Sequence, residues 1–233
     1  MRGSGVGPQD GVPVWGPQDP AYDWSLQDLA QIWGVDTGRP PAPARSGLLA
    51  ERKFVEIRLG GSGGQGVVLM GVILAEAADL DRRCVVNTES YGPEARGGYS
   101  RSDVIISDDP IDYPKLQKAD VLLALSQAAA VQYVPTLDPG GIFIYDSELV
   151  SEPPAFRGTT FAVPMQRIAK QATGRVQTTN VVALAVLVKI TGVVSVESAR
   201  RAVWETVPSG TEEMNLKAFS AGLAIEPEQY RVA

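Results

Sequence analysis

The chain has 233 residues, of which 44% are hydrophobic and 21% are charged, so it is long enough for one packed domain with an extension. Its net charge of −6 argues against a nucleic-acid-binding protein, which needs a basic surface. With one cysteine, Cys84, and no histidine, the composition excludes an internal disulfide, zinc and iron–sulfur sites, and histidine-based acid–base catalysis.

Residues 1–50 are rich in proline and glycine, which predicts a long irregular extension that buries no core of its own. Within it, the apolar residues of segment 24–34 have helical spacing and end at a glycine, so we expect a short helix there. The extension also holds three of the four tryptophans, Trp15, Trp24 and Trp33. Because exposed tryptophan is costly, we expect the extension to dock, either on its own domain or on a partner subunit.

From residue 54 the pattern changes to short apolar strands alternating with helices. Strands are predicted at residues 54–59, 84–87, 99–107, 121–125, 142–145 and 160–163. Helices are predicted at residues 66–78, 127–134, 165–172, 180–190, 195–207 and 212–223, which makes the last third helical. The pattern therefore predicts a Rossmann-like α/β domain over residues 51–233, with a mostly parallel sheet and helices on both faces.

Several single features carry structural expectations. The helix at 66–78 is apolar nearly all round and is expected to be buried, as are Cys84 in a strand and Trp204 in the core. Asn180 precedes an apolar helix and is expected to cap it. The longest apolar run, residues 181–188, is too short to span a bilayer, and no signal-peptide pattern follows Met1. We therefore expect a cytoplasmic protein without membrane insertion.

A glycine-rich loop lies between the first predicted strand and helix and matches the pattern G-x-G-x-x-G. Its residues are Gly61, Ser62, Gly63, Gly64, Gln65 and Gly66. Such glycines permit a tight turn, and the helix N-terminus then offers free N–H groups to a phosphate. A dinucleotide site also needs an acidic residue after the second strand, where this chain has Asn87, with Glu89 two residues later. The match is incomplete, and the alternative that the glycines only allow close packing stays open.

A second motif, residues 90–100, follows the second predicted strand and reads Ser-Tyr-Gly-Pro-Glu-Ala-Arg-Gly-Gly-Tyr-Ser. Pro93 fixes one backbone angle while the glycines free others, so the loop has a defined shape. Its arginine suits two-point binding of a carboxylate or phosphate, or it pairs with the neighbouring glutamate and braces the loop. The candidate binding residues of this motif are Tyr91, Glu94, Arg96, Gly97 and Gly98.

Both motifs, together with residues 104–107, 120–127 and 215–219, resemble the gamma subunit or gamma domain of the 2-oxoacid:ferredoxin (acceptor) oxidoreductase family. The resemblance covers residues 54–222 and leaves the first 50 residues unmatched. Segment 111–127 is similar to the 2-oxoglutarate branch. An aryl-glyoxylate, pyruvate or branched-chain oxoacid is the alternative substrate.

The resemblance implies the chemistry of a whole complex. In this family a 2-oxoacid is decarboxylated on thiamine diphosphate with magnesium, electrons leave through iron–sulfur clusters, and the acyl group passes to coenzyme A. The chain has no Gly-Asp-Gly thiamine–magnesium motif and no run of spaced cysteines. The resemblance therefore implies alpha, beta and ferredoxin-like delta subunits that carry those groups, and ferredoxin or another electron acceptor. No catalytic residue is expected in this chain alone.

We expect the chain to contribute to coenzyme A binding and to closure of the active site. In a doubly wound sheet, the loops after the first and fourth strands meet at the topological switch point. If the strands have that arrangement here, Gly61–Gly66 face one crevice together with Ser126 and Gln127, and residues 91–98 flank it. The pyrophosphate of coenzyme A would then have Arg96 as its charge partner.

Two alternatives belong to other classes of protein. A free-standing NAD-binding oxidoreductase predicts dinucleotide binding by the isolated chain. A pure assembly scaffold predicts that substitutions in the glycine loop change the stability of the complex and leave its kinetics alone.

Overall fold

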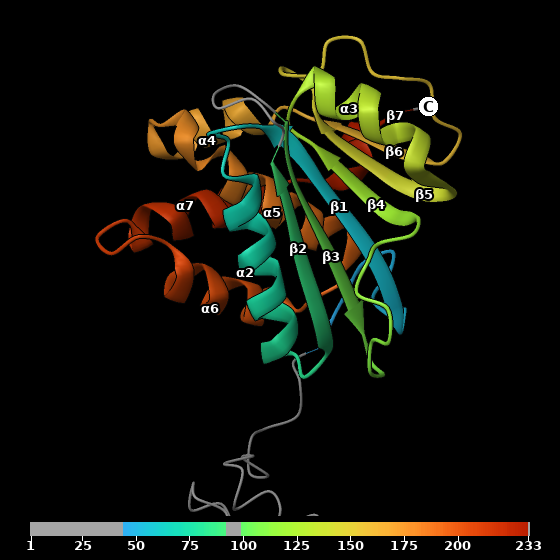
Figure 1. Cartoon of the computed structure of the whole chain (residues 1–233). Helices are drawn as coiled ribbons and strands as arrows, with labels where there is room; N and C mark the ends of the chain where they lie inside the picture. The colour runs from blue at the N-terminus through green and yellow to red at the C-terminus, as the bar shows by residue number, and fades with distance from the viewer. Residues whose placement is uncertain (1–43, 92–98, 233) are drawn as a thin grey trace, which may run out of the picture. The chain divides into compact units, whose positions relative to one another are not determined.

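In the computed structural model, which describes residues 44–91 and 99–232, seven strands form one sheet in the order β2-β3-β1-β4-β5-β6-β7 (Figure 1). The strands are β1 (Phe54–Ser62), β2 (Cys84–Tyr91), β3 (Tyr99–Ser107), β4 (Ala119–Ala124), β5 (Leu137–Asp146), β6 (Thr159–Val163) and β7 (Arg231–Val232).

The sheet is mostly parallel, as predicted. Strands β1, β4, β5 and β6 pair in parallel, one after the other. Strand β3 is antiparallel to both β1 and β2, and β7 is antiparallel to β6, so only β3 and β7 run against the rest in the described part of the chain. The β2–β3 hairpin was not predicted from the sequence, and it places β3 between the first two strands.

Helices cover both faces of the sheet. They are α2 (Val67–Leu80), α3 (Gln127–Tyr133), α4 (Met165–Thr173), α5 (Thr179–Thr191), α6 (Val196–Thr206) and α7 (Glu212–Leu223), with short 3-10 turns η2 (Val134–Thr136), η3 (Val176–Thr178) and η4 (Pro227–Tyr230). Helix α3 lies on one face, and the other helices lie together on the opposite face (Figure 1). Every strand and helix predicted from residue 54 onward is present in the structure, with shifted ends in several cases.

Successive side chains along a strand point to opposite faces of the sheet, so the domain has two hydrophobic cores, one on each face. Val55, Ile57 and Leu59 of β1 point into the larger core, which α5 fills from the other side. The smaller core lies under α3 and includes Leu122 and Phe143. Helix α2 is buried on one face only, so the prediction that it is buried all round was wrong.

Three single-residue predictions were also wrong. Cys84 is exposed. On the edge strand β2 the side chain of Val85 packs against the larger core, so the side chain of the preceding Cys84 points to the opposite face of the sheet. The side chain of Trp204 lies on the outer side of α6 and is 50% exposed. Asn180 does not cap α5, because Thr178 holds the N-cap position.

Residues just before β1 pack against the C-terminal end of α5. The backbone N–H groups of Leu48 and Leu49 donate to the carbonyls of Ile190 and Thr191 at 3.0 and 2.7 Å. The boundary near residue 50 stays a prediction. The predicted helix at 24–34 and Trp15, Trp24 and Trp33 lie outside the described residues.

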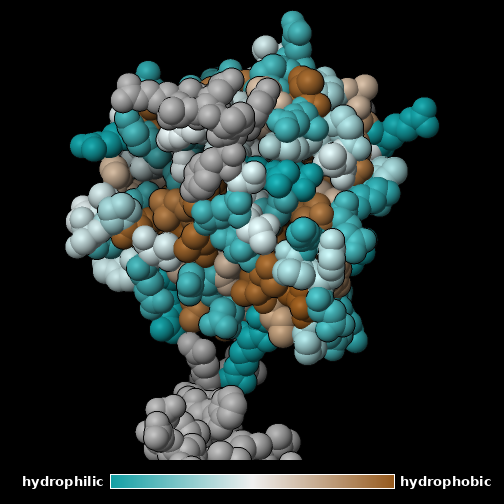
Figure 2. Space-filling view, in the orientation of Figure 1, coloured by the Kyte–Doolittle hydropathy of each residue, from teal (hydrophilic) through white to brown (hydrophobic). Residues whose placement is uncertain are grey.

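The surface of the domain is mixed in polarity. Figure 2 shows apolar patches set within mostly hydrophilic side chains on the face that Figure 1 presents. Within the described ranges, no helix combines the length and apolar character that a membrane span requires.

Candidate functional site

The loops after β1 and β4 lie side by side at the carboxyl ends of these two parallel strands. Gly60 is paired with Ala124 in the ladder, and the N–H of Leu125 donates to the Gly60 carbonyl at 2.8 Å. From this point α2 continues to one face of the sheet and α3 to the other (Figure 1). The structure thus places the glycine loop at a topological switch point, the position where ligands bind in open α/β sheets.

The glycine loop has a fixed shape. Gly64 and Gly66 have φ of 89° and 71°, in the left-handed region that favours glycine. The side chain of Gln65 closes the loop, since its Oε1 accepts from the Ser62 N–H at 2.6 Å and its Nε2 donates to the Leu125 carbonyl at 2.8 Å. A single amide therefore joins the loop after β1 to the end of β4.

Asn180 of α5 supports the same loop from behind. Its Nδ2 donates to the Gly66 carbonyl at 3.4 Å, and a Cβ added to Gly66 would lie 2.4 Å from that nitrogen. Sequence reasoning missed this contact, because the two residues are 114 positions apart and no local pattern links them. The close approach explains why the position at 66 needs glycine for space as well as for its φ.

A cavity of about 180 Å³ opens beside the loop. Its lining residues are all uncharged: Gly64, Gln65, Leu125, Leu149, Gln166, Val176, Gln177 and Thr179. Within the described residues, and apart from its two neighbours in the chain, no atom lies within 4 Å of where a Cβ on Gly64 would stand.

A buried carboxylate stands behind one wall of the cavity. Asp146 ends β5 with 0% of its surface exposed, and it accepts hydrogen bonds from the N–H groups of Gln166 at 2.7 Å and Glu148 at 2.8 Å. Burial raises the pKa of the Asp146 carboxyl, while these backbone hydrogen bonds act in the opposite direction.

Ser126 and Gln127 lie next to the glycine loop but do not line the cavity. The Ser126 hydroxyl caps α3 by accepting from the Ala129 N–H at 3.2 Å. The Gln127 amide exchanges two hydrogen bonds with the backbone of Glu152, at 2.7 and 3.0 Å. Both side chains thus have structural partners, and their predicted role in binding stays a prediction.

The second motif flanks the same edge of the sheet. Tyr91 ends β2 opposite Ser100, and Ser62 is paired with Tyr99, so the ends of β2 and β3 lie at the level of the glycine loop. Residues 92–98 lie outside the described part of the chain. The candidates there, Glu94, Arg96, Gly97 and Gly98, therefore stay predictions, as does the side chain of Tyr91.

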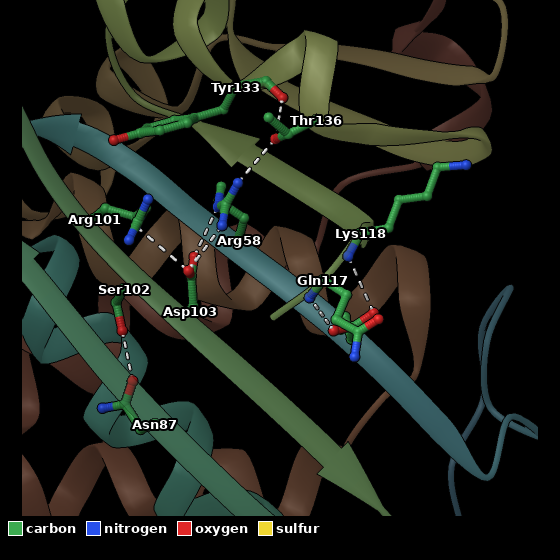
Figure 3. A network of polar contacts seen from close by, with 10 residues as sticks. Arg58, Asn87, Arg101, Ser102, Asp103, Gln117, Lys118, Tyr133 and Thr136 are labelled. Carbon is green, nitrogen blue, oxygen red and sulfur yellow. Dashed lines mark hydrogen bonds and ion pairs between the residues drawn. The ribbon is translucent and has the colours of Figure 1, made fainter. Parts of the chain in front are cut away.

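A polar network that the sequence did not reveal lies on the α3 face of the sheet (Figure 3). Arg58 binds both carboxylate oxygens of the buried Asp103, at 2.8 and 2.9 Å, and donates to the Thr136 hydroxyl at 2.8 Å. Arg101, partly exposed, approaches the same carboxylate at 3.4 Å. Both guanidinium groups lie over the ring of Tyr133, at 5.2 and 5.9 Å from its centroid. The network attaches α3 and η2 to the strands beneath them.

The position of β3 argues against an ordinary NAD site. In a dinucleotide-binding fold the acidic residue that holds the ribose ends the strand next to β1. Here β3 lies between β1 and β2, so Glu89 is two strands away from the glycine loop. Asn87 instead accepts a hydrogen bond from the Ser102 hydroxyl at 2.7 Å (Figure 3). Among the described residues there is no group of His, Cys, Asp and Glu that could hold a metal ion.

Comparison with known proteins decides the family. The family model for pyruvate ferredoxin/flavodoxin oxidoreductase matches residues 56–225. The chain belongs to this family. It is 47% identical over 176 residues to the 2-oxoglutarate synthase subunit KorC of Methanocaldococcus jannaschii, covering 74% of this chain and 94% of that protein. The predicted resemblance to gamma subunits is confirmed, and the chain is a subunit of an oxidoreductase complex.

Solved structures agree with this assignment. The gamma subunit of a keto/oxoacid ferredoxin oxidoreductase from Geobacter sulfurreducens matches with a TM-score of 0.65 and 46% identity, over 72% of this chain and 96% of that one. A 2-oxoglutarate:ferredoxin oxidoreductase from Magnetococcus marinus, with 2-oxoglutarate, coenzyme A and succinyl-CoA bound, matches with a TM-score of 0.64 and 25% identity. That match covers 74% of this chain and 31% of the other, so the same fold recurs there within a longer chain.

Proposed function

We propose that this gamma subunit belongs to a thiamine-diphosphate-dependent, CoA-acylating 2-oxoglutarate:ferredoxin oxidoreductase, in which it helps to hold coenzyme A and to close the active site. The observation that carries the proposal is the glycine loop, which stands at the topological switch point beside an open cavity. The relatives supply the substrate, because KorC subunits of 2-oxoglutarate synthases are 47% and 46% identical to this chain.

Coenzyme A binding has independent support. The related enzyme from Magnetococcus marinus was solved with coenzyme A bound. In this chain the N–H groups of the first turn of α2 and the charge of Arg96 suit a pyrophosphate. We place the pyrophosphate at the glycine loop, with Arg96 as its charge partner and the second motif alongside.

The remaining chemistry belongs to partner subunits. We assign thiamine diphosphate, magnesium and the iron–sulfur clusters to alpha, beta and ferredoxin-like delta subunits, with ferredoxin or another carrier as the electron acceptor and the cytoplasm as the compartment. Purifying the chain anaerobically from its native host, and assaying the complex with several 2-oxoacids, tests this assignment. CoA-dependent oxidation of 2-oxoglutarate supports it, whereas preference for an aryl-glyoxylate, pyruvate or a branched-chain oxoacid overturns the substrate.

The Arg96→Ala variant of the complex tests the coenzyme A site. Loss of a charge-assisted contact of about 1.5–3 kcal/mol should raise the KM for coenzyme A about tenfold or more, with the KM for the oxoacid unchanged. Arg201→Ala is the matched control, since Arg201 is exposed on α6 and pairs only with Glu205 among the described residues. An assembled Arg96→Ala complex with an unaltered KM for coenzyme A would contradict the proposal.

An assembly scaffold is the second candidate. It is favoured by the internal hydrogen bonds of Gln65, Ser126 and Gln127, which show that much of the loop region holds itself together. In that case Gln65→Ala lowers the stability of the complex and leaves both KM values unchanged. A change in the KM for coenzyme A without loss of assembly would exclude a purely structural role.

A further inference from the structure

In the described part of the chain, helices cover one face of the sheet and only part of the other. Helix α3 packs on β1 and β4, and no helix lies over β2 and β3 on the same side (Figure 1). Val104 and Ile106 of β3 point into the larger core, so the residues that alternate with them point to this uncovered side. We call the uncovered side of β1, β3 and β2 the open face. Its side chains are those of Phe54, Glu56, Arg58, Cys84, Val86, Thr88, Ser90, Arg101, Asp103, Ile105 and Ser107.

The amino-terminal end of β1 and the strands beside it make one end of the open face apolar. An antiparallel sheet can leave one face in water, and its outward side chains are then polar. Here Val86 and Ile105 are instead paired in the register, and Phe54 at the start of β1 is 46% exposed. Figure 2 shows apolar side chains gathered below the centre of this face, among hydrophilic ones. This end of the open face therefore offers apolar groups for a further contact.

The other end of the open face has an excess of positive charge (Figure 3). Arg58 binds both oxygens of Asp103, at 2.8 and 2.9 Å, so these two charges balance each other. Arg101 only approaches the same carboxylate, at 3.4 Å, and its side chain is 34% exposed. Glu56, the other carboxylate on the open face, already accepts from the Gln117 N–H at 2.7 Å. The guanidinium of Arg101 therefore suits a carboxylate that another molecule supplies.

The open face has the dimensions of one helix. Neighbouring strands lie about 4.8 Å apart, so β1 and β2 on either side of β3 are separated by about 9.6 Å, close to the width of a helix of about 10–12 Å. Arg101 and Ile105 belong to the same strand, β3. The distance between them along the strand is about 14 Å, which equals about nine residues of helix. A helix with an acidic residue near one end and apolar residues near the other thus matches both ends of the open face.

We infer that the open face is the docking surface for one helix of a partner subunit, which brings a carboxylate to Arg101 and apolar side chains to Val86 and Phe54. The chain is a subunit of an oxidoreductase complex, so partners that can cover such a face are part of its assembly. Interfaces between subunits combine an apolar centre with arginine anchors, and the open face has both. The inference concerns assembly and is independent of the coenzyme A site proposed above.

The first test measures access to the open face in the assembled complex, in a Cys84→Ser background that removes the native thiol. Thr88 lies in the middle of the open face and is exposed in this chain, as is Ser220 on α7. A thiol reagent should label Thr88→Cys about tenfold or more slowly than Ser220→Cys, because the partner helix protects it. A thiol-to-amine cross-linker on Thr88→Cys should join it to a partner subunit. Rapid labelling of Thr88→Cys, or a cross-link to a second copy of this chain, overturns the inference.

The second test lets variant and wild-type chains compete for the same partner subunits during co-expression, and mass spectrometry of the purified complex gives their ratio. Val86→Glu places a charge among the apolar groups and should be incorporated about tenfold less than the wild type. Val196→Glu, at a 43% exposed valine of α6 on the covered side of the sheet, is the matched control and should compete equally.

Arg101→Gln tests the charged end of the open face. It should be incorporated less than the wild type by a smaller factor than Val86→Glu, since one charge-assisted contact is lost. The wild-type complex should release this subunit more readily in about 1 M than in about 0.1 M salt, and Arg101→Gln should reduce that dependence, because salt screens the pair of charges.

Incorporation of Val86→Glu and Arg101→Gln at the wild-type ratio overturns the inference. Normal incorporation of Arg101→Gln with a raised KM for coenzyme A also overturns it, because Arg101 then binds a small anion. The Arg96→Ala variant bears only on the coenzyme A site, so either proposal can fail while the other stands.

Discussion

Helices α5 and α2 are both strongly apolar in composition and have different surroundings. Both are apolar nearly all round, yet twelve of the thirteen residues of α5 are buried, against seven of fourteen in α2. Helix α5 packs against α2, α4, α6 and α7, so neighbours surround it. Helix α2 packs on β2, β3 and α6 at the edge of the sheet, and Val68 and Val72 stay half-buried on its outer side.

The difference shows that an apolar composition allows a helix to be buried but does not determine where in the fold the helix lies or how many of its faces are covered. A helix that is hydrophobic on all sides is expected inside a large core, and α5 meets that expectation. The same pattern in α2 led to a wrong prediction, because the chain supplies no further element to cover its outer face within the described residues.

The largest expected effect comes from the centre of α5. Leu184→Ala removes a side chain with 0% exposure from the larger core. Loss of buried apolar area together with the cavity left behind should lower the free energy of unfolding by about 2–5 kcal/mol. Urea unfolding of the purified chain measures this loss. A loss below about 1 kcal/mol would show that α5 is less tightly packed than its burial indicates.

A smaller effect is expected where α7 meets α5. A Cβ on Gly222 would lie 2.6 Å from both the Ala185 Cβ and the Val182 carbonyl oxygen. Gly222→Ala therefore forces the two helices apart and should cost about 1–3 kcal/mol, although alanine is the better helix former. Ser220→Ala, at an exposed position of the same helix, serves as the control and should leave the midpoint of thermal unfolding nearly unchanged.

The smallest effect tests the outer face of α2 directly. Val72→Ser should lower the free energy of unfolding by about 1 kcal/mol or less, because water already reaches part of this side chain. The matched substitution in α5, Val186→Ser, buries a hydroxyl at a fully enclosed site and should cost about 2–3 kcal/mol. Equal losses of unfolding free energy in the two variants would show that the different burial of the two helices does not change the cost of a polar substitution.

Local sequence patterns were sufficient to predict the strands, the helices and the glycine loop after β1. The alternation of strand and helix signals predicted each element from β1 to α7, and the glycine pattern placed a tight loop between β1 and α2. These features depend on residues that are close together in the sequence and therefore also close together in the folded chain. The family resemblance likewise came from motifs within short segments.

The contacts that shape the site were not predictable in this way. The pairing of Arg58 with Asp103 joins residues 45 positions apart on two different strands. Asn180 was expected to be a helix cap and instead contacts Gly66. The cavity exists only where segments from five parts of the chain converge, and no one segment carries a signal for it.

The sequence by itself determined the order of strands and helices, the position of the glycine loop and the family, because each depends on residues close together along the chain. The tertiary structure alone decided that β3 lies between β1 and β2, which face of α2 is covered, and that the space beside Gly64 is lined by uncharged groups. Those outcomes depend on which distant segments pack together, since burial and hydrogen bonding are properties of the neighbours that folding supplies.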